Sequence, residues 1–276
     1  MNLKKYQVLD SFLNISAQRM EKAALYTAGP GIAAIYSCSS PVDDNPNQDQ
    51  AAILPISKDI LVLIVADGAG GHADGDSASA RVIIEIKKAI NASLKNGGEI
   101  REAILSGIEN ANRSIIENLS GAASTVALVE IQNESIRTYH AGDSEVLVTG
   151  LRGKIRHQIL KHSPVGYAEE AGLLDESQAI MHEERHIVSN ILGFDDMHIT
   201  VSTSTKLNSH DTLIVGTDGL FDNLQKEEII EIIRKGPLHK CAGSLIEKVN
   251  HRMNEPKTDE PSKFDDMSFI LFRLKK

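Results

Sequence analysis

The sequence ILVLIVA, residues Ile60–Ala66, is followed directly by DGAGGH, residues Asp67–His72. An unbroken apolar run of this length is typical of a strand that is buried on both faces. The glycines after it indicate a backbone that approaches a ligand closely. A carboxylate at the rim of such a strand is partly desolvated, which disfavours its charged form unless a cation is near. Asp67 is therefore a candidate functional residue.

The same arrangement occurs twice more in the chain. Asp218 follows the apolar run TLIVGT, residues 212–217, and Asp265 stands just before the run MSFILF, residues 267–272. Each Asp-Gly step alone can be read as an ordinary turn, because Asp accepts local backbone hydrogen bonds and Gly adopts positive φ. Several such carboxylates brought together would repel one another, and a hard divalent ion would resolve that conflict. Ligands that are all oxygen favour Mg²⁺ or Mn²⁺ over zinc.

The remaining pattern predicts an α+β fold. Strands alternate with pairs of helices but not in a strict βαβ order, which favours helices packed outside antiparallel sheets. Within residues 1–30, the apolar spacing of Val8, Leu9, Phe12 and Leu13 fits one face of a helix. We expect residues 1–30 to form an N-terminal extension with no assigned role and residues 31–276 to form one domain. Besides the runs already quoted, we expect strands at 32–37, 50–56, 124–131, 135–140 and 145–149, and helices at 76–95, 99–119, 168–173, 226–235 and 238–253.

Composition excludes several classes of protein. The formal net charge of -9 over 276 residues argues against nucleic-acid binding, because no basic stripe offsets it. No apolar run approaches the length of a membrane span. Asp10 and Asn14 interrupt what would have to be a signal-peptide core. Cys38 and Cys241 lack a metal-type or disulfide-type spacing and indicate core thiols in a reducing compartment. We expect a cytoplasmic protein.

The order of short motifs resembles that of the metal-dependent protein phosphatases of type 2C, the PPM family, in their bacterial form. Each motif is short, but six in family order across about residues 31–274 make a specific match. The motifs are Asn47-Gln48-Asp49, Ala66–His72, Ala123-Ser124-Thr125, Ala141–Ser144, Thr217–Asn223 and Asp265–Ser268. The segment His162–Tyr167 resembles the start of the flap of this family.

This resemblance implies a fold, a reaction and a set of ligands. The fold would be a sandwich of two antiparallel β-sheets between outer pairs of α-helices. The reaction would be hydrolysis of phosphoserine or phosphothreonine in a phosphoprotein by a hydroxide that bridges two Mn²⁺ or Mg²⁺ ions. Many members hold a third ion, and a cognate Ser/Thr kinase is the expected partner. The implied ligands are Asp49, Asp67, Asp218 and Asp265, the backbone carbonyl of Gly68, and, for the third ion, Asp143 together with Asp218.

Three positions depart from the family pattern. The phosphate-binding arginine usually stands five residues before the first motif aspartate, and here that position is Asp44. An acid cannot make the bidentate phosphate contact of an arginine. The residue after Gly-Asp-Ser is Glu145 instead of arginine. The histidine that follows Asp-Gly in eukaryotic members is Ala69, as in bacterial members, and His72 does not simply inherit its role.

Two other functions stay open at this point. The loss of the arginine would also suit a catalytically weak or inactive module that binds a phosphoprotein or a regulatory partner. A phosphotransferase with an aspartyl intermediate would need a D-x-D motif after a strand. Asp74-Gly75-Asp76 has that spacing, but the sequence predicts that it opens a helix.

Overall fold

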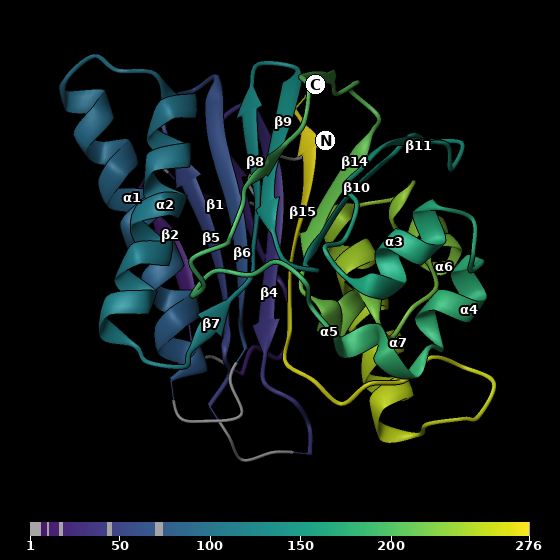
Figure 1. Cartoon of the computed structure of the whole chain (residues 1–276). Coiled ribbons are helices and arrows are strands. Elements are labelled where there is room, and N and C mark those ends of the chain that lie inside the picture. Colours follow the sequence, from purple (N-terminus) through teal and green to yellow (C-terminus); the bar gives the residue numbers. More distant parts are fainter. Residues whose placement is uncertain (1–6, 10, 17–18, 43–45, 70–73, 276) are drawn as a thin grey trace.

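The computed structural model describes residues 7–9, 11–16, 19–42, 46–69 and 74–275, and it contains two β-sheets packed face to face (Figure 1). In the first sheet, β1 and β3 pair in parallel, and the other pairs of described strands are antiparallel. Its order is β1 (Gln7–Val8), β3 (Ala24–Ala28), β4 (Gly31–Cys38), β15 (Met267–Leu274), β14 (Thr212–Gly216), β10 (Glu145–Thr149) and β11 (Ile155–Gln158).

The second sheet is antiparallel and carries the strand with the apolar run of residues 60–66. That strand, β6, is longer than expected and continues through the aspartate to Ala69. The order is β12 (Thr200–Val201), β9 (Ser135–Ala141), β8 (Val126–Gln132), β6 (Ile60–Ala69), β5 (Asp49–Pro55) and β2 (Leu13–Ser16), with β13 (Thr205–Lys206) on β9 and β7 (Ala123–Ser124) on β6.

Helices cover the outer face of each sheet, as expected from the sequence (Figure 1). The apolar face of α1 (Gly75–Lys95) and α2 (Ile100–Asn118) packs on the second sheet through residues such as Val82 and Ile104. On the first sheet lie α5 (Asp218–Phe221), α6 (Lys226–Ile233) and α7 (Leu238–Asn254). A third cluster, which includes Leu63 and Phe272, fills the space between the sheets. Burial of each such side chain stabilises the fold by ~1.5–3 kcal/mol.

The prediction of a helix within residues 1–30 is wrong. Residues 13–16 form β2, which pairs antiparallel with β5, and residues 24–28 form β3, which pairs with β4. The apolar spacing of Phe12 and Leu13 fits either structure, and edge pairing with two buried strands decides in favour of extended chain. Both sheets thus gain strands from this part of the chain.

The polar stretch after residue 163 contains short helices instead of the single one expected at 168–173. They are α3 (Pro164–Glu170), α4 (Glu176–Ile180) and the 3-10 helix η2 (Glu183–His186). Helix α3 begins earlier than expected, because the Ser163 hydroxyl accepts a hydrogen bond from the Gly166 N–H and Pro164 takes the first helical position. We call residues 163–193 the flap segment.

Candidate metal centre

Asp49 and Asp67 lie opposite each other, at the first residue of β5 and near the end of β6. Asp49 is 1% exposed, and its Oδ2 accepts a hydrogen bond of 2.7 Å from the Thr217 hydroxyl. The Asp49 N–H donates to Asn47 Oδ1 at 2.8 Å. The two carboxylates are therefore held side by side by sheet register, and Thr217 on the other sheet connects the two layers.

Gly68 follows in a position that admits no side chain. Its N–H donates to the Gln48 carbonyl at 3.1 Å, and an added Cβ would overlap the carbonyl oxygen of Gly75 at the start of α1. Because residue 68 is glycine, the end of β6 can lie this close to the residue before β5 and to the start of α1.

Asp218 and Asp265 lie just beyond the ends of neighbouring strands of the first sheet. Asp218 is the first residue of α5, just after β14, and is 7% exposed. Asp265 precedes β15, which pairs antiparallel with β14, and its Oδ1 accepts the N–H of Asp266 at 2.9 Å. Within the described residues, the buried Asp218 Oδ1 has no hydrogen-bond partner. An orphaned carboxylate oxygen of this kind is suited to a cation.

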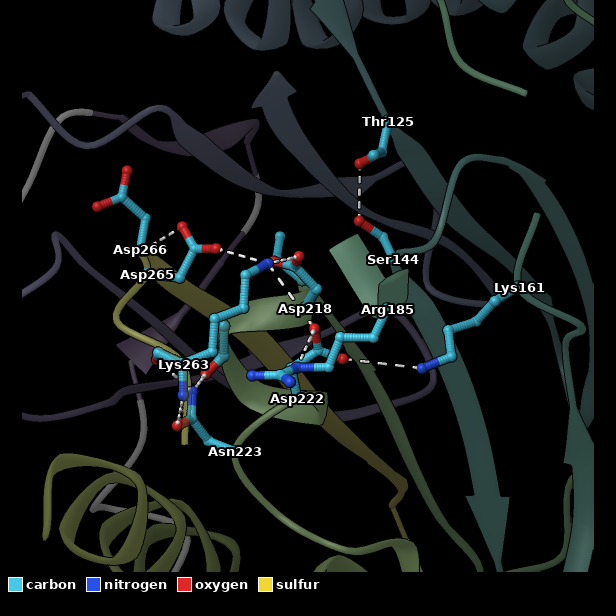
Figure 2. A network of polar contacts seen from close by, with 12 residues as sticks. Thr125, Ser144, Lys161, Arg185, Asp218, Asp222, Asn223, Lys263, Asp265 and Asp266 are labelled. Carbon is cyan, nitrogen blue, oxygen red and sulfur yellow. Dashed lines mark hydrogen bonds and ion pairs between the residues drawn. The ribbon is translucent and has the colours of Figure 1, made fainter. Parts of the chain in front are cut away.

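A hydrogen-bonded chain connects the turn that carries Asp143 to Asp67. Thr125 Oγ1 lies 2.7 Å from the hydroxyl of Ser144, the residue after Asp143 (Figure 2). The same Thr125 oxygen accepts the Asp67 N–H at 3.0 Å. Gly142 adopts a φ of 117° to make the turn between β9 and β10. Asp143 is thereby fixed at 4% exposure beside the other carboxylates.

The electrostatics show that these aspartates form one cluster. Burial, followed by the carboxylate of Asp218 and other neighbouring carboxylates, raises the pKa of Asp67 well above its usual value. The same two causes raise the pKa of Asp143 to about 8 and that of Asp265 to about 6. Burial and then the carboxylate of Asp266 raise the pKa of Asp49. The cluster is therefore short of positive charge at neutral pH.

The Lys263 ammonium lies within this cluster (Figure 2). It touches Asp218 Oδ2, lies 2.8 Å from Asp265 Oδ2 and lies 3.7 Å from Asp222 Oδ2. Burial disfavours its charge, but these carboxylates outweigh burial and raise its pKa. Among the described residues, no three His, Cys, Asp or Glu side chains converge on one ion position as they stand.

Two further cations surround Asp222, on the flap side of the cluster (Figure 2). Lys161 Nζ lies 3.8 Å from Asp222 Oδ1 and 3.1 Å from Glu145 Oε1. Arg185 Nε lies 3.8 Å from Asp222 Oδ2, and its Nη2 donates to the Ser262 carbonyl at 3.1 Å. Glu145, which replaces the family's arginine, thus serves as the partner of Lys161.

Asp266, the neighbour of Asp265, uses its carboxylate to hold the backbone before β5. Its Oδ1 accepts the Ser40 N–H at 2.8 Å, and its Oδ2 accepts the Gln48 N–H at 2.6 Å. Asp44 and His72 lie outside the described residues.

The sequence pattern missed the part played by Lys263 and Asp222. Lys263 stands in a charged segment, 256–263, that reads as a solvated loop. Its position two residues before Asp265 was the only available signal, and spacing in a loop does not fix the direction of a side chain. Asp222 belongs to a quoted motif, but its two cationic neighbours come from distant segments.

The fold and the carboxylate cluster together are typical of a protein with a buried, all-oxygen site for divalent ions. Comparison with known proteins places it more closely: the model of the protein phosphatase 2C family matches residues 39–254. The chain belongs to this family, and the resemblance read from its motifs is confirmed.

Named relatives and solved structures agree with this assignment. Protein phosphatase PhpP of Streptococcus pneumoniae is 27% identical over 198 residues, which cover 69% of this chain and 80% of PhpP. The serine/threonine phosphatase stp of Listeria monocytogenes is 26% identical over 215 residues, covering 74% of this chain and 84% of stp. The structure of Stp1 from Staphylococcus aureus matches with a TM-score of 0.76 and 23% identity over 95% of this chain and 100% of that one. This last likeness confirms the sandwich fold.

Proposed function

We propose that this chain hydrolyses phosphoserine and phosphothreonine in proteins, using Mn²⁺ or Mg²⁺ held by the carboxylate cluster. The single observation that supports this most is that buried aspartates from both sheets lie near enough for their carboxylates to raise one another's pKa, with too little positive charge around them. The proposed ligands of two ions are Asp49, Asp67, Asp218 and Asp265 with the Gly68 carbonyl, and a third ion would take Asp143 with Asp218.

The donor set fits such ions. All of the proposed donors are oxygens, which suits Mg²⁺ and Mn²⁺, and Asp218 Oδ1 has no partner among the described residues. A relative of 22% identity, the catalytic domain of the phosphatase PstP, has been solved in complex with two manganese ions. Ions bound here would lower the pKa of water and offset charge on the phosphoryl oxygens.

The chain's own residues position the carboxylates for this chemistry. The Thr217 hydroxyl donates to Asp49 Oδ2 and so orients this carboxylate, whose other oxygen stays available for an ion. Thr125 holds the backbone of Asp67 from both directions, since its N–H donates to the Asp67 carbonyl at 2.8 Å and its Oγ1 accepts the Asp67 N–H. Hydrogen bonds of this kind, one step away from a ligand, fix the geometry of a metal site.

The phosphate side of the site differs from the family pattern. Asp44 replaces the arginine in the sequence, and the described cations beside the cluster are Lys161, Arg185 and Lys263. All three contact Asp222. We therefore place the phosphate on the Asp222 side, between the metal centre and the flap segment.

The partner and the compartment follow as parts of this proposal. The substrate is a phosphoprotein, the flap segment contributes to its selection, and a Ser/Thr kinase supplies the phosphate that is removed. Cys38 and Cys241 are free thiols, which supports a reducing compartment and so the cytoplasm. None of the helices in the described part of the chain is long and apolar enough to cross a membrane.

Removal of metal should abolish activity. The chain, stripped with EDTA and assayed on a phosphothreonine peptide and on para-nitrophenyl phosphate, should gain at least about a hundredfold in rate when Mn²⁺ is added, because metal ions contribute several kcal/mol to such hydrolyses. The assay should be repeated with Mg²⁺, with Ca²⁺ as a control ion of larger radius.

Activity that persists at full rate in EDTA would contradict the proposal. A chain that binds Mn²⁺ and the phosphopeptide without hydrolysing it would instead favour the binding module, the alternative that Asp44 motivates. Peptide binding measured by fluorescence anisotropy alongside the rate separates these two outcomes.

A further inference from the structure

Lys263 occupies a place that a divalent ion would need. Its ammonium touches Asp218 Oδ2 and lies 2.8 Å from Asp265 Oδ2 (Figure 2). Both carboxylates are proposed ligands. Oxygen ligands of Mg²⁺ lie at about 2.0–2.1 Å, so an ion bound by the two carboxylates would fall within the space of this ammonium.

Hydrogen bonds hold the backbone of Lys263 in place, whereas its side chain is partly exposed. The Lys263 N–H donates to Asn223 Oδ1 at 2.9 Å, and its carbonyl accepts from Asn223 Nδ2 at 2.9 Å. Asn223 is fully buried, and its carbonyl accepts from Arg252 Nη1 at 3.0 Å. The side chain of Lys263 is 21% exposed, and its ammonium already lies 3.7 Å from Asp222 Oδ2, so solvent and Asp222 are the alternative surroundings open to it.

We propose that Lys263 is an internal counter-cation that competes with a divalent ion for the Asp218–Asp265 position. This inference rests on the proposed function, because it assumes that the cluster binds metal. Without an ion, the ammonium offsets the repulsion between the carboxylates and keeps them together. With an ion bound, two cations cannot share the position, so the ammonium leaves it.

The competition sets the apparent affinity of this position. An ion whose position is free in only about a tenth of the molecules binds about tenfold more weakly than it otherwise would. Among the described residues, neither Asp49 nor Asp67 forms an ion pair with a lysine, arginine or histidine as Asp218 and Asp265 do, so these two ligands are not subject to this competition. Lys263 therefore makes the ion position at Asp218 and Asp265 the weaker of the two.

The test is Mn²⁺ binding to the EDTA-stripped full chain by isothermal titration calorimetry. Lys263→Met keeps the apolar stem and removes the charge, and Lys263→Gln is a second uncharged variant in case the first does not fold. Both should bind Mn²⁺ at one position about tenfold more tightly than the wild type. The stripped variants should also unfold at a lower temperature than the stripped wild type, since their carboxylates lack a counter-cation.

Lys226→Met is the matched control. Lys226 also bridges two carboxylates, at 3.1 Å from Glu169 and 3.5 Å from Glu176, and its side chain is 17% exposed. Neither glutamate is a proposed ligand, so this variant should bind Mn²⁺ as the wild type does.

Two results would overturn the inference, and they differ in what else they affect. If the wild type binds Mn²⁺ and both Lys263 variants bind it no more tightly, the competition is absent and the proposed function stands. If the stripped wild type takes up no Mn²⁺ at all, the proposed function fails together with the inference.

Discussion

Replacement of Asp218 by asparagine is expected to lower kcat/KM on a phosphothreonine peptide about a thousandfold, equivalent to ~4 kcal/mol of transition-state stabilisation. Asp218 lies at the centre of the cluster, because its charge acts on Asp67, Asp143 and Asp265 alike. Asparagine preserves the shape of the side chain but removes the charge that a divalent ion requires. Steady-state assays with saturating Mn²⁺ measure the effect.

Asp211→Asn is the matched control, since Asp211 is a buried aspartate at the opposite end of the same strand. It is 2% exposed, and its Oδ2 accepts the Asn208 N–H at 3.0 Å. This variant should lose some stability and keep its activity. Equal activity of the wild type and Asp218→Asn would remove Asp218 from the proposed site.

Gly219→Ala is expected to lower the free energy of unfolding by disturbing the backbone beside the carboxylate cluster. An added Cβ would overlap the Asp266 carbonyl oxygen and approach the Met267 Cα to 3.3 Å. Because backbone cannot yield as a side chain does, we expect a loss of ~1–3 kcal/mol. For a chain of this size that corresponds to a fall in Tm of roughly 2–12 °C. Calorimetry of the stripped chain measures it.

Gly243→Ala is the control with the opposite expected sign. Gly243 lies inside α7, and an added Cβ there would meet nothing within 4 Å. Alanine should therefore stabilise the helix by ~0.5–1 kcal/mol. A Gly219→Ala variant as stable as the wild type would show that α5 and the segment before β15 can separate freely.

The buried strands and the long helices could be predicted because their signals are local. Residues 60–66 are apolar throughout, and the helices at 76–95 and 99–119 carry an apolar face at helical spacing. The structure confirms them as β6, α1 and α2 with shifts of a few residues at their ends. The error near Phe12 arose because apolar pairs at that spacing suit a helix face and an edge strand equally, and only pairing with the distant β5 decides.

The candidate site likewise has a part that could be predicted from local sequence and a part that could not. The placement of Asp67, Asp218 and Asp265 beside apolar runs is visible in the sequence, and the motif order adds Asp49, Gly68 and Asp143. The position of the Lys263 ammonium depends on how Asn223 holds a loop backbone, and no sequence period encodes that contact. The cations around Asp222 likewise come from segments distant in the sequence, Lys161 before α3 and Arg185 in η2.

Anomalous diffraction at the manganese absorption edge, from crystals equilibrated with saturating Mn²⁺, tests the central claim most directly. The account predicts two strong peaks inside the carboxylate cluster, one of them between Asp218 and Asp265, with the Lys263 side chain turned away from that position. A cluster without any manganese peak, and with the Lys263 ammonium still between Asp218 and Asp265, would contradict it.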